Sequence, residues 1–230
     1  VLGLTAHLQR LYEPVLSPEV DDSFLRRQLF ALLEPFRPGE TRVRAMMTRH
    51  GQVYLAIMPL SSLPREVYQT GVRVETTDLH RESPHLKSTA FIAASDSERK
   101  HIAQEGVFEA LLVQDGIILE GMTSNFFCVV GRDGILPSIR TARDDILLGV
   151  TRQTIIDIAQ RSGLNVEYEP LEMDQLDGVS EAFITSSSRG IVPVVQIDEV
   201  TIGQGRPGPV TKQLSAGYEA YVLEQAEKIV

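Results

Sequence analysis

A lysine, a glutamate and two short polar segments are the parts of this chain whose residue types and spacing suit chemistry. Lys87 lies between a proline-containing turn and the small and apolar residues of SPHLKSTAFIAA. Burial among apolar groups lowers the pKa of an amine, and a neutral amine can condense with a carbonyl group. We therefore expect a sheltered, reactive Lys87, with a solvated lysine beside a helix start as the ordinary alternative.

Glu120 follows Lys87 by 33 residues, at the end of the apolar segment IILEG. A carboxylate in this position could hold a protonated ring nitrogen, and the ordinary alternative is an exposed glutamate in a turn. The residues after it, Met122 to Asn125, form a small and mostly polar patch between two apolar segments. This pattern is typical of a lined cavity.

Two further segments could bind an anion. In GVTR, Val150 and Thr151 open an apolar helix, where free N–H groups and the helix dipole favour negative charge. In TSSSRG, the hydroxyl groups of Ser186, Ser187 and Ser188 end an apolar strand and could bind phosphate or carboxylate. Other helix starts and polar loops look similar, so neither segment alone identifies a ligand.

Composition limits the class of protein. The chain has 230 residues, a net charge of −9 and a single cysteine. An acidic protein is disfavoured as a partner of nucleic acid or anionic membrane, and no apolar run approaches about 18 residues. The first residues lack the features of a signal peptide, and the lone Cys128 can form neither an internal disulfide nor a CxxC metal site. We expect a cytoplasmic protein with no metal, membrane or nucleic-acid partner.

The elements that must position these residues mix hairpins with segregated helices, which indicates an α+β fold rather than a doubly wound one. No GxGxxG follows a strand. Apolar periodicity predicts a first helix capped by Thr5 and further helices at 21–34, 88–104, 149–162 and from 209. Hairpins are predicted at 41–58, 107–121 and 124–138, and they turn near His50-Gly51, Asp115-Gly116 and Asp133-Gly134 respectively. Further strands are predicted at 72–77, 166–171, 181–187 and 191–197. The segment PLSSLPREVYQTG, with two prolines and a final glycine, predicts a linker.

In their order and spacing these features resemble the class IV pyridoxal-phosphate aminotransferases, which include branched-chain and D-amino-acid aminotransferases and aminodeoxychorismate lyase. HLQRLY at 7–12 is similar to the family's N-terminal His-x-x-Arg-Leu motif, and GQGRPGPVTKQL at 203–214 to the tail of the branched-chain enzymes. The resemblance covers nearly the whole chain. It implies fold-type IV, with an N-terminal α/β subdomain at 1–58, an interdomain loop at 59–70 and a C-terminal cofactor-binding subdomain at 71–230 that contains a pseudo-barrel.

The resemblance also implies roles for individual residues. Lys87 matches the lysine that holds pyridoxal 5′-phosphate and moves a proton from the substrate Cα, and Glu120 matches the carboxylate that pairs with the ring nitrogen. The remaining matches are to cofactor-binding positions at Arg10, Val150, Thr151, Ser186 and Ser187, and to substrate-binding positions at Arg44 and Ser188.

Three features depart from the family pattern. Ala90 stands where many relatives have an asparagine, and Ile92 where branched-chain enzymes often have a tyrosine. The family's usual opening strand, which contributes to the active site, is missing ahead of Val1.

The expected function is a PLP-dependent transamination, in which an amino group moves between an amino acid and a 2-oxo acid in a ping-pong cycle. Arg44 and the branched-chain-like tail favour an L-amino acid as donor. The alternatives are 4-amino-4-deoxychorismate lyase, which eliminates pyruvate with the same lysine and cofactor, and a degenerate, non-catalytic family member. The resemblance implies a homodimer.

Overall fold

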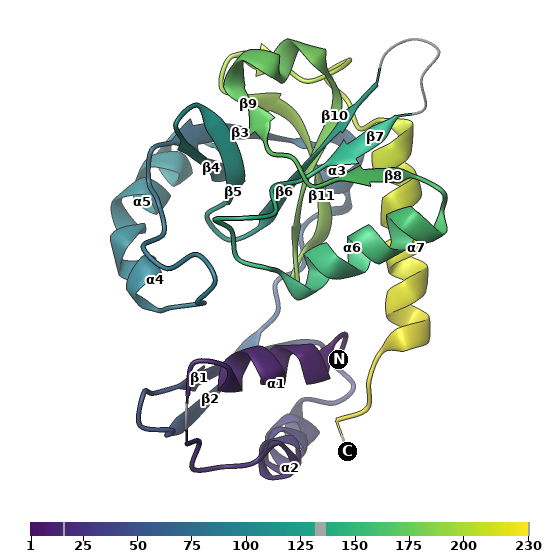
Figure 1. Ribbon diagram of the computed structural model, residues 1–230. Coiled ribbons are helices and arrows are strands. Elements are labelled where there is room, and N and C mark those ends of the chain that lie inside the picture. The colour runs from purple at the N-terminus through teal and green to yellow at the C-terminus, as the bar shows by residue number, and fades with distance from the viewer. Residues whose placement is uncertain (16, 132–136, 230) are drawn as a thin grey trace. The chain divides into compact units, whose positions relative to one another are not determined.

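The computed structural model describes residues 1–15, 17–131 and 137–229 (Figure 1). Within these ranges no helix combines the length and the apolar character needed to cross a membrane. Contacts divide the chain into two compact units, Val1–Ser62 with Ala220–Val230, and Leu63–Glu219. Residues 220–229 thus belong to the first unit, whereas the sequence prediction had grouped them with the C-terminal subdomain.

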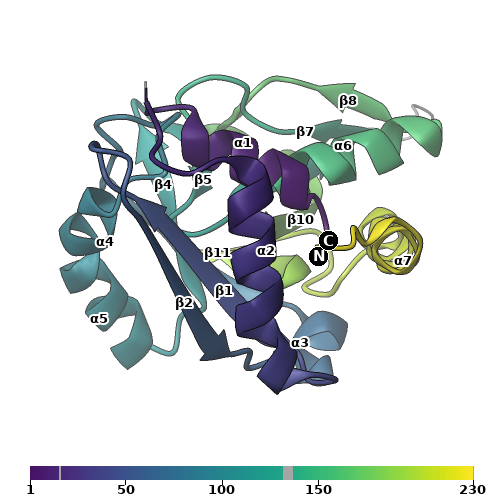
Figure 2. The same ribbon diagram turned by 90° about the horizontal axis from the view of Figure 1, so that it is seen from below.

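The first unit is a β-hairpin that packs against two helices (Figure 2). Its elements are α1 (Leu4–Tyr12), α2 (Asp22–Leu33), a 3₁₀ turn (Glu34–Phe36), β1 (Thr41–Met47) and β2 (Val53–Pro59). The predicted hairpin at 41–58 is confirmed. Leu4 and Leu8 of α1 and Leu25 and Leu29 of α2 form its buried core.

The two helices begin differently. The helix predicted at 21–34 is present as α2, and Asp21 caps it, with its carboxylate accepting a hydrogen bond from Phe24 N at 2.6 Å. The prediction that Thr5 caps α1 is wrong, because α1 already begins at Leu4, after Gly3 in the left-handed region. Thr5 instead donates from Oγ1 to Glu227 Oε2 at 2.7 Å. Val1 and Glu227 also exchange backbone hydrogen bonds, which joins the two segments of this unit.

The second unit contains the larger sheet. Its helices are α3 (Arg65–Thr70), α4 (Ala90–Ala94), α5 (Asp96–Gln104), α6 (Val150–Arg161), the 3₁₀ segment η2 (Met173–Gly178) and the start of α7 (Pro209–Gln225). Its strands are β3 (Val72–Thr77), β4 (Glu109–Gln114), β5 (Ile117–Gly121), β6 (Asn125–Val130), β7 (Ser138–Arg140), β8 (Asn165–Glu167), β9 (Leu171–Glu172), β10 (Val179–Ser186), β11 (Gly190–Ile197) and β12 (Val200–Thr201).

Six of these strands form a closed ring in the order β6, β10, β11, β3, β4, β5, and the ring closes where β5 pairs with β6. Its closing pair is Glu120 opposite Asn125. The β11–β3 and β3–β4 pairs are parallel and the other four are antiparallel. The predicted fold class is therefore confirmed: α+β, with a pseudo-barrel of mostly antiparallel strands flanked by helices.

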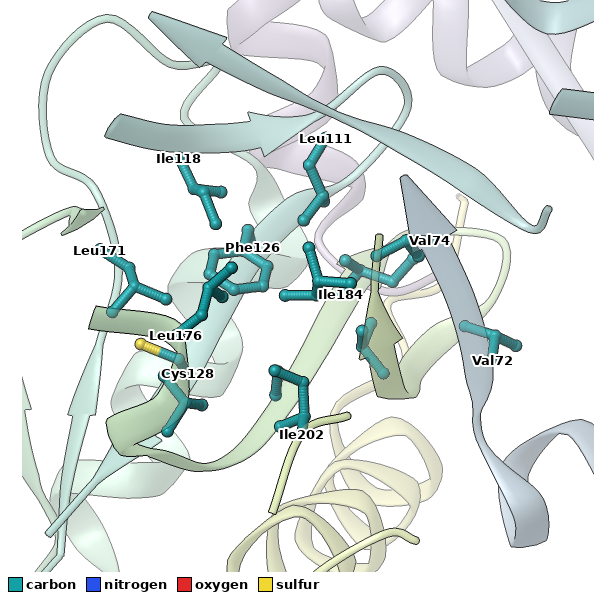
Figure 3. Close-up of a cluster of buried hydrophobic side chains, with 14 of the residues drawn as sticks. Val72, Val74, Leu111, Ile118, Phe126, Cys128, Leu171, Leu176, Ile184 and Ile202 are labelled. Atoms are coloured by element: carbon teal, nitrogen blue, oxygen red, sulfur yellow. The ribbon is translucent and has the colours of Figure 1, made fainter. Parts of the chain in front are cut away.

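Apolar side chains fill the inside of the ring. Figure 3 shows Leu111, Ile118, Phe126 and Ile184 from four different strands pointing toward one another, and each is almost fully buried. Burial of one such side chain stabilises a fold by roughly 1.5–3 kcal/mol. Because the interior is packed, polar groups that serve chemistry have to lie at the strand ends and in the connecting turns.

Most predicted elements of this unit are present. The Asp115-Gly116 turn is confirmed: both residues have positive φ (51° and 77°), as a two-residue hairpin turn requires. The predicted turn at Asp133-Gly134 lies outside the described residues. The single helix predicted at 88–104 is wrong, because it breaks at Ser95, whose Oγ donates back to Phe91 O at 2.7 Å.

Two other segments differ from the prediction in extent. Residues 65–70 of the predicted linker form the short helix α3. The strand predicted at 166–171 is divided between β8 and β9, which pair with different neighbours. The residue pattern of VEYEPL at 166–171 did not reveal that its two halves pair with different strands.

Candidate active site

The ring of strands places a buried carboxylate at its closing pair. Glu120 lies near the end of β5 and is only 1% exposed. Its Oε1 accepts a hydrogen bond from Arg81 Nε at 2.6 Å. Its Oε2 accepts from Leu147 N at 3.0 Å and from Asn125 Nδ2 at 3.2 Å. The alternative of an exposed turn glutamate is therefore wrong.

The surroundings of Glu120 raise the pKa of its carboxyl group to about 7. Burial is the largest cause, because it disfavours the charged form, and the negative charge of Glu109 acts in the same direction. The ion pair with Arg81 and the hydrogen bond from Leu147 N oppose this rise. A carboxyl group in this state can hold or release a proton near neutral pH.

Arg81 is a site residue that the sequence reasoning missed. Besides its ion pair with Glu120, it donates from Nη2 to Met122 O at 2.8 Å, and its guanidinium lies 3.8 Å from the centre of the Phe91 ring. It thus ties the loop between β3 and α4 to the turn that follows Glu120. A lone arginine in a polar loop is usually solvated, so only its position six residues before Lys87 could have drawn attention to it.

Lys87 lies in that same loop, three residues before α4 begins, and its side chain is exposed within this chain. The expectation that the fold itself shelters Lys87 is therefore wrong. The apolar residues that suggested a buried start belong to α4, which begins only at Ala90 and buries Phe91 instead.

The start of α6 offers backbone donors to a ligand. Gly149 precedes the helix in an extended conformation, and no side chain in the described part of the structure caps it. A Cβ atom at Gly149 would collide with Asn125 Oδ1, so glycine is what lets α6 approach the partners of Glu120. Val150 begins the helix, and the buried Thr151 points a hydroxyl toward the β10–β11 turn, 3.4 Å from Ser187 Oγ.

The serine turn joins β10 to β11. Ser186 is the last residue of β10 and pairs with Gly190, while Ser187 and Ser188 lie in the turn itself. Thr185 precedes them, and its Oγ1 is buried without a hydrogen-bond partner among the described residues. Of these hydroxyl groups, that of Ser187 lies beside the start of α6, through its contact with Thr151.

The remaining candidates lie in the first unit and are described within it. Arg10 of α1 is half-buried, with Nη2 3.4 Å from His7 Nδ1, and burial lowers the pKa of its guanidinium. Arg44 of β1 is exposed, opposite Ala56 of β2. Its neighbour Val43 packs on the helices, so Arg44 lies on the face of the hairpin away from them.

The residues of the second unit fit the predicted cofactor at both of its ends. A phosphate suits the N-terminus of α6, where the hydroxyl groups of Thr151 and Ser187 lie 3.4 Å apart. A ring nitrogen suits Glu120, whose carboxyl group has a pKa close to neutral. Asn125 connects the two ends, since it bonds Glu120 and lies against Gly149.

Comparisons with known proteins agree with this geometry. A family model described as amino-transferase class IV matches residues 1–197. A D-alanine aminotransferase of Bacillus licheniformis is 28% identical over 99% of this chain and 85% of its own length. The branched-chain-amino-acid aminotransferase of Escherichia coli K12 is 30% identical over 72% of this chain and 55% of its own length. A crystal structure of the T.th. branched-chain amino acid aminotransferase with pyridoxamine 5′-phosphate superimposes with a TM-score of 0.86, at 24% identity, over 99% of this chain and 81% of that one.

Proposed function

Because this chain belongs to the amino-transferase class IV family, and is accordingly a transaminase that uses pyridoxal 5′-phosphate, we propose that it transfers amino groups from an L-amino acid with a branched apolar side chain to a 2-oxo acid. The buried Glu120, held between Arg81 and Asn125 where the ring closes, is the observation that carries the assignment of the site. Relatives that are aminotransferases do not favour the lyase alternative.

When bound, pyridoxal phosphate supplies an aldehyde that condenses with amines and a ring that withdraws electrons. Glu120 would hold the ring nitrogen, and its near-neutral pKa allows the proton to be shared between the two. Arg81 and Asn125 fix the two carboxylate oxygens in place, so that the carboxyl group needs no reorganisation when charge develops.

Lys87 would hold the aldehyde carbon and exchange with the amine of the substrate. Once released, its Nζ would accept the proton from the substrate Cα as a general base. Its place in an exposed loop suits an amine that has to move between these two tasks. Arg81, six residues earlier, ties this loop to Glu120.

The phosphate would be held by the N–H groups of Val150 and Thr151 and by the hydroxyls of Thr151, Ser186 and Ser187. A dianion held by several donors cannot rotate freely, which keeps the ring against Glu120. Arg10 of the first unit is proposed as a further phosphate ligand, in line with its HLQRLY motif.

The substrate carboxylate would be bound by Arg44 and by the turn at Ser188. Arg44 is exposed on the hairpin face away from α1 and α2, so its guanidinium is accessible to a ligand. The branched-chain-like segment GQGRPGPVTKQL contributes the turn before α7. Together with the name of the E. coli relative, these features support an L-branched donor.

The homodimer and the cytoplasmic location remain proposals. They are supported by the family resemblance and by the single, buried Cys128, which suits a reducing compartment. Light scattering of the purified protein tests the first, with a mass of twice 25.5 kDa expected.

The substrate proposal is tested by following half-reactions as loss of the visible absorbance of the cofactor-loaded enzyme. L-Leucine, L-valine, D-alanine and L-alanine would each be added without an acceptor. The proposal expects the fastest loss with L-leucine and L-valine, and recovery of absorbance when 2-oxoglutarate is then added. A preference for D-alanine would overturn the donor assignment, and pyruvate released from aminodeoxychorismate without an acceptor would overturn the reaction type.

A further inference from the structure

The site holds a second buried carboxylate that the mechanism does not use. Glu109, the first residue of β4, is only 2% exposed. Its Oε1 accepts hydrogen bonds from Thr123 N at 2.6 Å, Thr123 Oγ1 at 3.0 Å and Ser124 Oγ at 3.0 Å. Both donor residues belong to the turn that follows Glu120, so Glu109 braces the loop that joins β5 to β6.

The other oxygen of Glu109 faces Arg189, in the turn between β10 and β11. Glu109 Oε2 lies 2.8 Å from Arg189 Nη2 and has no aligned hydrogen-bond donor among the described residues. The same Nη2 donates to Thr123 Oγ1 at 2.7 Å, and Arg189 Nε donates to Ser186 Oγ at 3.0 Å. One guanidinium therefore bridges the turn after Glu120 and the serine turn.

The rest of Arg189 is also fixed. Its side chain is 19% exposed, with the guanidinium 5.2 Å from the centre of the Phe108 ring. Its backbone oxygen accepts a hydrogen bond from Tyr68 Oη at 2.9 Å. A long side chain loses much rotamer freedom in such an arrangement.

Stability alone explains this pair poorly, because desolvation of two charges offsets much of their attraction, and an apolar pair of similar volume is often as stable. What the planar guanidinium adds is orientation, since its donors lie in a rigid fork that fixes several acceptors at once. Its acceptors here are the hydroxyl groups of Thr123 and Ser186, which lie in the two turns of the proposed site, while Glu109 pairs with it by charge.

We propose that Arg189, held by Glu109, is a positioning residue that fixes the serine turn relative to the turn after Glu120, so that the serine turn can bind an anionic oxygen group of the reactants. This inference rests on the proposed function of the site. Two sources could supply that group, the phosphate of the cofactor and the carboxylate of the 2-oxo acid.

The test compares Arg189→Met, Arg189→Lys and the control Arg161→Met, an exposed arginine of the same unit at the end of α6. Three quantities are measured: the dissociation constant of pyridoxal phosphate by visible absorbance, and kcat and KM for the 2-oxo acid at saturating cofactor. Arg189→Met is expected to raise either the dissociation constant of the cofactor or the KM for the 2-oxo acid about tenfold, as loss of hydrogen bonds from a charged donor does. The kcat should be much less affected. Weaker binding of the cofactor would identify its phosphate as the ligand of the serine turn, and a higher KM would identify the carboxylate of the 2-oxo acid.

Lysine at position 189 should recover part of the loss, because its amine can reach Glu109 but cannot also hold Ser186 and Thr123. If Arg189→Met alone leaves Glu109 uncompensated and fails to fold, the double variant Glu109→Gln, Arg189→Met removes both charges and should show the same loss of binding. The inference is overturned if, in a folded variant, the dissociation constant of the cofactor and the KM for the 2-oxo acid both stay within about twofold of those of Arg161→Met. That margin is well below the loss of one such hydrogen bond. Inactivity of the wild-type enzyme toward every donor would instead overturn the proposed function.

Discussion

Glu120 shows how one side chain can serve both the fold and the chemistry. Its two oxygens accept from three donors, and burial still raises the pKa of its carboxyl group to about 7. A raised pKa means that the folded protein binds this proton more tightly than the unfolded chain does. Its contribution to stability is therefore full below the ordinary pKa of glutamate and is lost as the pH rises toward 7.

The first prediction concerns Glu120→Gln, which cannot titrate. Between pH 4.5 and about pH 7 the cofactor-free wild type should lose about 3 kcal/mol of unfolding free energy relative to this variant. Urea unfolding at several pH values measures the difference. Glu199→Gln, in an exposed turn, is the control, and a constant difference between wild type and Glu120→Gln across this range would contradict the raised pKa.

The second prediction concerns Lys87→Ala. Because Lys87 is exposed and lies in a loop, its removal should change the unfolding free energy by no more than about 0.5 kcal/mol. The variant should nevertheless lose the visible absorbance of the bound cofactor and its transamination. Transamination retained in this variant would remove Lys87 from its proposed role.

At the scale of elements, a buried carboxylate of one strand fixes the start of the last helix. Glu181 of β10 is 7% exposed and accepts hydrogen bonds from Val210 N at 3.0 Å and Thr211 N at 2.7 Å, which fixes the start of α7. A carboxylate at a helix start pairs free N–H groups and opposes the positive end of the dipole.

The third prediction follows from this contact. Glu181→Ala leaves two buried N–H groups without a partner and should lower the unfolding free energy by roughly 2 kcal/mol. Denaturant unfolding of the enzyme provides the measurement, with Glu219→Ala on the exposed face of α7 as the matched control. Equal stability of the two variants would show that α7 does not depend on this carboxylate.

The sequence predicted the helices and strands better than the contacts and breaks between them. Local signals were sufficient where one residue type sets the geometry, as at Asp115-Gly116. They failed where a distant partner decides, as at Arg81, which pairs with a residue 39 positions away, and where a side chain competes with the backbone, as at Ser95. The sequence drew attention to Glu120 but did not settle whether it is buried. The apolar residues around Lys87 gave no measure of its exposure, because they belong to a helix that starts later.

At the scale of the whole molecule, the first unit is built from both ends of the chain. Val1 and Glu227 exchange backbone hydrogen bonds, the Glu227 carboxylate accepts from Thr5, and Ile229 packs on the core of α1 and α2. Each of these contacts joins segments that lie near opposite ends of the sequence. The stability of the first unit therefore depends on the segment that follows α7.

The fourth prediction tests this dependence. Truncation after Gln225 removes these contacts and should speed hydrogen exchange of the α1 amides roughly tenfold, about the effect of losing one hydrogen bond. Exchange of the β10 and β6 amides in the second unit should not change. Mass spectrometry of peptides from both regions gives the comparison, and uniform acceleration in both would contradict an effect confined to the first unit.

The ring of strands closes at the residue pair that also holds the proposed ring-nitrogen ligand. Lys87, by contrast, is an exposed residue of the loop before α4. Selection on folding alone would therefore protect the buried carboxylate more strongly than the exposed lysine. In a family member that has lost its catalytic activity, we expect the lysine to be substituted first and the glutamate to be retained.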